Sequence, residues 1–107
     1  MATAQSTADY LTGQMAAAGP VHSRKMFGEY AIYCDDKMVA AICDDQLFVK
    51  PTEPGRQLIG TPDEVPPYHS AKPYYRIPAD RWDDHDWLSQ LIRVTADALP
   101  APKPKRR

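Results

Sequence analysis

The chain has 107 residues, with 13 Lys and Arg against 14 Asp and Glu, which gives a formal net charge of −1. This length suits one domain, and a hydrophobic content of 43% is enough to bury a modest core, so the composition excludes a wholly disordered chain. No apolar run approaches the roughly 20 residues that span a bilayer, and the first residues lack the basic and apolar pattern of a secretory signal. With only two cysteines, we expect reduced thiols, a cytoplasmic location and no membrane association.

The positive charge is concentrated at the C-terminal end, in Lys103, Lys105, Arg106 and Arg107. Without these four, residues 1–99 carry 9 positive against 14 negative charges, a net −5. An acidic body is atypical of proteins that bind duplex DNA, because neutralisation of phosphates supplies most of their affinity. We expect residues 1–99 to form one domain and residues 100–107 to be a disordered tail rich in Pro, Lys and Arg.

The N-terminal segment is predicted to form a helix that Ser6 or Thr7 caps and that Gly19 and Pro20 end. Its apolar residues recur at spacings of three and four and form one stripe, namely Ala8, Leu11, Met15 and Ala18.

Residues 21–50 change to a period of two, which predicts strands. The predicted strands are 24–27, 30–34, 37–43 and 46–50. Asp35-Asp36 and Asp44-Asp45 are predicted to form two-residue hairpin turns, because Asp tolerates a positive φ angle.

If both turns contain two residues, the strand register follows. The expected partners are Tyr33 with Met38, Ile32 with Val39, Ile42 with Leu47 and Ala41 with Phe48. The expected core face then carries Ala31, Tyr33, Met38, Ala40, Ile42, Leu47 and Val49. The opposite face has an apolar centre, made of Ile32, Val39, Ala41 and Phe48, and a polar rim. We expect this second face either to lie under a helix or to form a protein interface.

Capping residues, glycine and prolines mark the ends of the predicted elements after residue 50. Thr52 is predicted to cap a short helix that stops at Gly60, and residues 61–73 are irregular because they contain four prolines. A strand is predicted over 74–77. Asp83 or Asp84 is then expected to cap a last helix that ends before Pro100.

The sequence contains no recognisable catalytic or metal-binding pattern. His22, His69 and His85 fall in different elements without a ligand spacing, and no nucleophile elbow or Gly-rich phosphate loop is present. Cys34 and Cys43 are expected on one sheet face about 20 Å apart, too far for a disulfide. We therefore expect no catalytic residue, no metal and no cofactor.

Three functions agree with these features. The first is contact with a protein partner, or homodimer formation, through the second sheet face. The second is weak nucleic-acid binding through the tail and strand cations Arg24, Lys25, Lys50 and Arg76, although the acidic body disfavours it. The third is a small-molecule pocket lined by Tyr30, Tyr33, Tyr74, Tyr75 and Trp82.

Three segments together resemble the TfoX/Sxy family N-terminal domain. These are Arg24-Lys25-Met26-Phe27-Gly28 with the strand through Tyr33, then Gln46-Leu47-Phe48-Val49-Lys50, and finally Lys72 to Pro78 followed by Trp87. The resemblance covers about residues 8–99.

The resemblance implies an α+β fold, with an antiparallel meander sheet and terminal helices in the order α-β-β-β-α-β-β-α, similar to secretion-chaperone-like folds. This order requires that residues 24–34 form one bent strand and that a short strand lies near residues 65–69. The family name comes from regulators of natural competence, whose longer members have a second, C-terminal helical domain, and we expect this chain to be a version without that domain. The resemblance thus implies a stand-alone, non-enzymatic domain that acts by protein contact, in regulation related to competence or gene expression.

Overall fold

The structure is a computed structural model that describes residues 3–26, 28–68 and 70–100. Its elements, in chain order, are α1 (Gln5–Gln14), the 3₁₀ turn η1 (Ala16–Ala18), β1 (Val21–Met26), β2 (Glu29–Cys34), β3 (Lys37–Cys43), β4 (Gln46–Val49), α2 (Glu53–Ile59), β5 (Asp63–Val65), β6 (Tyr74–Ile77), the 3₁₀ turn η2 (Ala79–Arg81) and α3 (His85–Ala98). All strand pairs are antiparallel, in the sheet order β1-β2-β3-β4-β6-β5. The predicted α+β class is confirmed.

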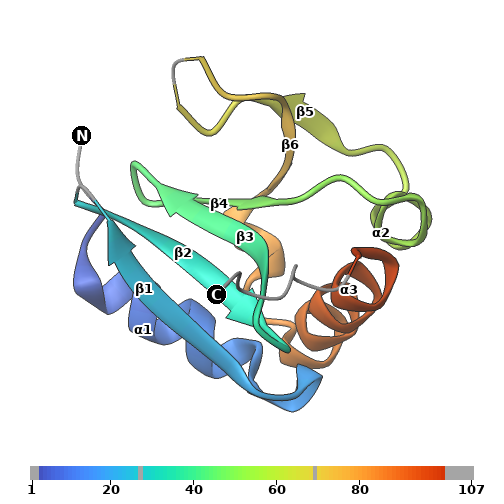
Figure 1. The fold of residues 1–107 in the computed structure, drawn as a ribbon, viewed down its shortest axis with the longest axis horizontal. Coiled ribbons are helices and arrows are strands. Elements are labelled where there is room, and N and C mark those ends of the chain that lie inside the picture. The colour runs from blue at the N-terminus through green and yellow to red at the C-terminus, as the bar shows by residue number, and fades with distance from the viewer. Residues whose placement is uncertain (1–2, 27, 69, 101–107) are drawn as a thin grey trace, which may run out of the picture.

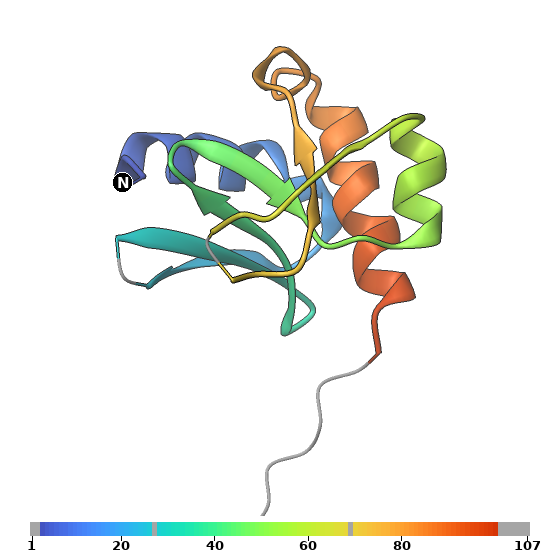
Figure 2. The same ribbon diagram turned by 90° about the horizontal axis from the view of Figure 1, so that it is seen from above.

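The helices pack on one face of the sheet, where the main core lies (Figures 1 and 2). This core joins the buried sides of α1 and α3 to one face of β2, β3 and β4, and Leu58 and Ile59 of α2 pack at its edge. A second, smaller cluster lies on the opposite face and contains strand residues alone. We call this opposite surface the helix-free face. No helix within the described ranges is long and apolar enough to cross a membrane.

The helix α1 begins earlier than predicted. Its N-cap is Ala4, without a side-chain hydrogen bond. The prediction of a cap at Ser6 or Thr7 is therefore wrong, and the Thr7 hydroxyl instead donates to Asp45 Oδ1 at 3.0 Å. The apolar stripe is confirmed, since Ala8, Leu11, Met15 and Ala18 are all buried.

The caps of the two later helices agree with the sequence. Thr52 Oγ1 accepts the N–H of Gly55 at 3.1 Å, and Gly60 ends α2 with a φ of 98°. Asp84 Oδ1 accepts the N–H of Trp87 at 3.1 Å at the start of α3. Each cap satisfies an N–H group that the first helical turn would leave without a partner.

The two hairpin turns are also confirmed. Asp35, Asp36, Asp44 and Asp45 have φ angles of 55°, 62°, 53° and 56°, the left-handed conformation that two-residue hairpin loops require. The turns set the pairs next to them: Tyr33 lies opposite Met38 as predicted.

The predicted register fails one residue later, because β3 contains a β-bulge. Ile32 lies opposite Ala40 instead of Val39, so Val39 is an extra residue in β3. The Val39 carbonyl accepts the N–H of Lys50 at 2.8 Å, which keeps the bulged backbone hydrogen-bonded. The bulge turns Val39 and Ala40 toward the same, helix-covered side, and both are fully buried in the main core.

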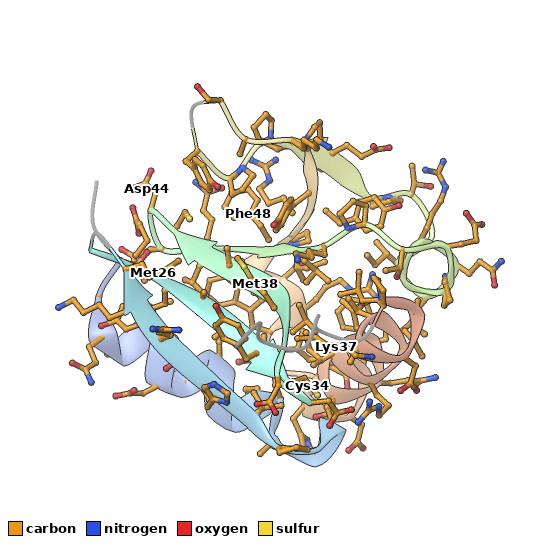
Figure 3. All side chains as sticks on the ribbon, viewed as in Figure 1. Met26, Cys34, Lys37, Met38, Asp44 and Phe48 are labelled. Carbon is orange, nitrogen blue, oxygen red and sulfur yellow. The ribbon has the colours of Figure 1, made fainter. Side chains whose placement is uncertain are left out.

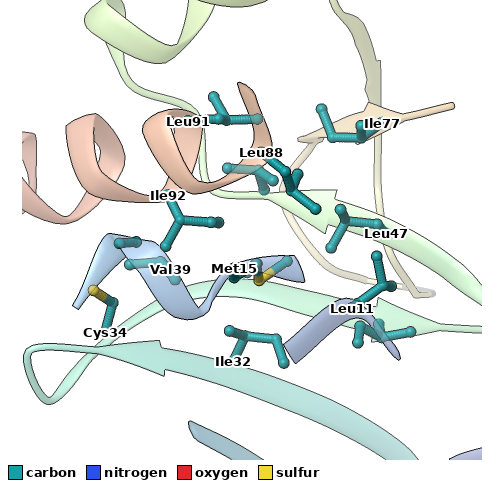
Figure 4. Packing of buried hydrophobic residues seen from close by; sticks show 14 of the residues in the cluster. Leu11, Met15, Ile32, Cys34, Val39, Leu47, Ile77, Leu88, Leu91 and Ile92 are labelled. Atoms are coloured by element: carbon teal, nitrogen blue, oxygen red, sulfur yellow. The ribbon is translucent and has the colours of Figure 1, made fainter. Parts of the chain in front are cut away.

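The bulge also exchanges the two faces of β2. Ile32 and Cys34 lie in the main core, and Figure 4 shows both beneath the helices with Val39. The side chains expected in the core, Ala31, Tyr33 and Met38, lie on the helix-free face instead. The predicted pairs of Ile42 with Leu47 and of Ala41 with Phe48, beyond the bulge, are correct.

Residues 24–34 do not form one bent strand. The segment is divided into β1 and β2, which pair with each other, with Gly28 at a φ of 81° between them. Four strands therefore precede α2, and the element order is α-β-β-β-β-α-β-β-α. The short strand expected near 65–69 is β5, two residues earlier in the chain.

Candidate binding site on the helix-free face

The helix-free face contains a cavity of about 500 Å³, which we call the hollow. It lies between the end of β1, the start of β2, one side of β3 and the segment that leads into β6, and Figure 3 labels two of its lining residues, Met26 and Met38. Its lining residues are Met26, Glu29, Tyr30, Ala31, Met38, Ala41, Cys43, Tyr68 and Tyr74.

Small side chains leave the hollow open. Ala31 and Ala41 lie opposite each other on β2 and β3, and a methyl group at each position occupies little volume above the sheet. Beside them on β4, Phe48 is packed with Val65 and Tyr74, so that part of the helix-free face is filled. The two alanines therefore form part of the lining of the cavity, although little of their own surface is exposed.

One carboxylate lines the hollow among the described residues, that of Glu29. Its Oε1 accepts the backbone N–H of Asp44 at 3.1 Å and is hydrogen-bonded to the hydroxyl of Thr3. The Thr3 oxygen also accepts the N–H of Asp45 at 3.2 Å. These bonds attach the chain before α1 to the β3–β4 turn and keep the Glu29 carboxylate at the edge of the hollow.

The pKa values of the Cys43 thiol and the Tyr74 phenol in the hollow are both raised. Burial, with the nearby Glu29 and Asp44 charges, raises the pKa of the Cys43 thiol to about 11. Burial likewise raises the pKa of Tyr74, with smaller effects from Tyr68 and Cys43. A protonated thiol is a poor nucleophile and a poor metal ligand, so Cys43 contributes mainly an apolar surface here.

The structure divides the predicted interface between two places. Ile32 and Val39 are in the main core with 0% of their surface exposed, so the prediction that they share one sheet face with Ala41 and Phe48 is wrong. Ala41 and Phe48 do lie on the helix-free face, but Met38, Val65 and Tyr74 pack over that cluster and leave them 4% and 3% exposed. The bulge at Val39 is the physical reason for this division.

The accessible apolar side chains of this face were missed from the sequence. Met26 and Tyr68 line the hollow and are 41% and 63% exposed. The sequence contained one signal for this exposure. Tyr68 directly follows two prolines, and an aromatic side chain in such a loop is expected at the surface.

The predicted nucleic-acid contacts do not form one surface in the described part of the chain. Arg24 and Lys25 are exposed on β1, at one edge of the sheet. Arg76 lies on β6, four strands away, and pairs with Asp63 at 3.1 Å. The predicted contacts Lys103, Lys105, Arg106 and Arg107 are outside the described residues.

The predicted aromatic pocket is only partly assembled. Tyr30 and Tyr74 line the hollow, whereas the Tyr33 ring stacks on His22 with centroids 5.2 Å apart. Tyr75 is buried, and the Trp82 indole N–H donates to the Ile77 carbonyl at 3.1 Å, away from the hollow.

The cysteines lie on opposite faces, Cys34 in the main core and Cys43 in the hollow, because the bulge separates them. The expectation that they share one face is wrong, and both are free thiols. Within the described ranges no three His, Cys, Asp or Glu side chains gather as a metal site, and His69 lies outside those ranges.

The chain is similar to known proteins of one family. The model of the TfoX N-terminal domain family matches residues 13–99. A curated relative, described as an uncharacterized 12.7 kDa protein in the trpE 5′ region of Spirochaeta aurantia, is 41% identical over 106 residues, which cover 99% of this chain and 91% of the relative. The chain therefore belongs to the TfoX N-terminal domain family, a competence-related family.

Proposed function

We propose that this domain is a non-enzymatic, cytoplasmic binding module that holds apolar side chains of a protein partner in the hollow. The observation that carries the proposal is the apolar cavity on the helix-free face. In this family context, the partner would belong to regulation related to competence or gene expression.

The distribution of exposed apolar side chains supports this proposal. Three large hydrophobic residues of the described chain are exposed, namely Tyr10, Met26 and Tyr68. Two of them border the hollow. Methionine and aromatic side chains are enriched at protein interfaces, where Met adapts its shape to a partner. The third, Tyr10, is instead hydrogen-bonded to Asp83.

The chemistry of the hollow also favours binding over catalysis. Its thiol is protonated at neutral pH, because the pKa of Cys43 is about 11. The Glu29 carboxylate is held by Thr3 and Asp44 at the edge of the cavity. The nearby Glu29 charge raises the pKa of the thiol further, so the carboxylate does not promote formation of a thiolate nucleophile.

The test is capture of partners from the native cytoplasm, followed by affinity measurement with the purified partner. The double variant Met26→Gln and Tyr68→Gln should weaken binding at least tenfold, because it replaces two exposed apolar surfaces at the hollow. Tyr10→Gln is the matched control, an exposed residue on α1 that should leave the affinity unchanged. Equal affinity of wild type and double variant would refute the proposal. A dimer mass lost in the double variant would identify the partner as a second copy.

A second candidate, small-molecule binding, is supported by the size of the hollow. A volume of about 500 Å³ lies within the range of ligand pockets, roughly 300–1,000 Å³. A metabolite that raises the melting temperature of wild type but not of the Met26→Gln, Tyr68→Gln variant would favour this function. A library screen without any stabilising compound would count against it.

A further inference from the structure

The sheet has two edges, and only one is suited to pairing with another strand. The edge strand β5 has three residues and lies between Pro62 and Pro66, which lack the N–H groups needed to extend a ladder. The other edge strand, β1, has six residues and contains neither Pro nor Gly. Apart from its pairing with β2, β1 makes no backbone hydrogen bond to another element among the described residues.

The open edge is positively charged, in contrast to the rest of the domain. The strand contains His22, Arg24 and Lys25, all exposed, and no acidic residue. None of these three forms an ion pair within the described part of the chain. Residues 1–99 as a whole carry 9 positive and 14 negative charges, so a cationic edge strand is a local feature.

The open edge is continuous with the hollow. Along β1, His22, Arg24 and Met26 share the helix-free side of the sheet with their partners on β2. Met26 ends the strand and lines the cavity. A strand added about 4.8 Å beyond β1 would place every second side chain on the same side as these residues.

We propose that β1 is the docking edge for an extended acidic segment of a protein partner, which adds to the six-stranded sheet as a seventh strand. Backbone hydrogen bonds to the open edge would supply affinity, and Asp or Glu side chains on both faces of the segment, beside Arg24 on one face and Lys25 on the other, would supply specificity. An apolar side chain at the end of the segment would enter the hollow past Met26. The inference rests on the proposed function, because it names the chemistry of the partner.

Charge argues against a second copy of this chain as the occupant. Antiparallel pairing of two β1 strands would bring Arg24 and Lys25 close to the same cations of the other copy, without an acidic residue in either strand. Like charges that face each other across paired strands are destabilising. Charged residues on an edge strand are a common protection against such self-pairing, and the same charges attract an acidic segment.

The probe is a fluorescein-labelled ten-residue peptide of eight Glu residues with one Val at each end, so that carboxylates lie on both faces of the added strand, measured by fluorescence anisotropy. Two further peptides carry N-methyl groups on the odd or the even residues, which removes the backbone donors of one peptide edge and keeps the charge. We expect binding of the parent peptide, a loss of at least tenfold for one N-methylated peptide and little loss for the other. A peptide with Lys in place of Glu should not bind.

The protein variants are Arg24→Glu with Lys25→Glu and, as a control for a charge reversal elsewhere on the surface, Arg56→Glu. Arg56 is exposed on α2, across the fold from β1 (Figure 1). The β1 variant should lose at least tenfold in affinity for the parent peptide, and the control should match wild type. Circular dichroism and urea unfolding check that both variants fold.

Several outcomes would overturn the inference. These are no binding of the parent peptide, equal affinity of both N-methylated peptides to the parent, equal loss in the Arg56→Glu control, or tighter binding of a single-stranded oligonucleotide through Arg24 and Lys25. The native partner separates this inference from the proposed function. A loss of its binding in the Met26→Gln, Tyr68→Gln variant but not in the β1 variant would retain the hollow and refute the docking edge. The reverse result would retain the docking edge and refute the hollow.

Discussion

The side chain of a single lysine caps the C-terminal end of α3. Lys37 lies at the start of β3, and its ammonium group donates to the carbonyls of Ala96 and Leu99 at 2.7 and 3.1 Å. The last carbonyls of a helix have no partner within the helix, and the helix dipole places negative partial charge there. We therefore expect Lys37→Met, which keeps most of the apolar stem, to destabilise the domain.

The magnitude follows from these two contacts. Hydrogen bonds from a charged group contribute about 1.5–3 kcal/mol where they are protected from water, and a cation at a helix C-terminus contributes about 0.3–1 kcal/mol. Lys37 is half-buried, so water replaces part of the lost bonding. We expect a net loss of about 1–2 kcal/mol, which corresponds to a fall in melting temperature of roughly 5–10 °C for a domain of this size.

Urea unfolding measures the loss, and an unchanged m-value would show that the change is in stability alone. Lys50→Met is the control, because Lys50 is also half-buried but its side chain makes no hydrogen bond among the described residues. Amide exchange in the last turn of α3 should accelerate in Lys37→Met and not in the control. If the two variants lose the same stability, the reasoning about the helix end is wrong.

Three further results are expected. The guanidinium of Arg93 lowers the pKa of Asp35, so their ion pair stabilises the fold at pH values above the ordinary carboxyl pKa. This stabilisation is lost as the pH falls through the lowered pKa. Asp35→Asn, which keeps the left-handed turn, should therefore be less stable than wild type at pH 6 and equally stable near pH 2 in urea titrations. Leu88→Ala removes a fully buried core side chain and should cost about 2–5 kcal/mol in the same assay, and a cost below 1 kcal/mol would show that the core is not packed as described. Cys34 and Cys43 should both resist iodoacetamide at pH 7.5 in the native protein and react rapidly in urea, because both are buried and both thiol pKa values are raised; rapid native labelling of either would contradict this.

The elements that sequence reasoning identified correctly are those with a local signal. Asp35-Asp36 and Asp44-Asp45 marked both hairpin turns, and Thr52 and Asp84 marked the starts of two helices. In each case the residue that gives the signal makes the contact or adopts the backbone angle that defines the structure. Such features need no knowledge of distant residues.

The faces of the sheet could not be derived in the same way. Residues 38–43 are all apolar or weakly polar, so no side chain in β3 reveals that Val39 is extra. Similarly, β1 has no apolar alternation, because it is exposed at the edge of the sheet, and its pairing with β2 was hidden. The hollow depends on both features and on Tyr68 from a loop, so only the folded chain brings it together.

The bulge at Val39 affects the curvature of β3, whereas the residue partners on either side of it do not depend on the extra residue. Removal of Val39 would leave the partners of Met38 and Ala40 unchanged, and each remaining side chain of the strand would keep its face. The extra residue acts on curvature, because a bulge bends its strand and increases the local twist, and Figure 1 shows β3 bent along its length. Val39 does not line the hollow. The curvature of the sheet beneath the hollow therefore depends on a residue outside the lining, so the shape of this surface is set partly from the opposite, helix-covered side.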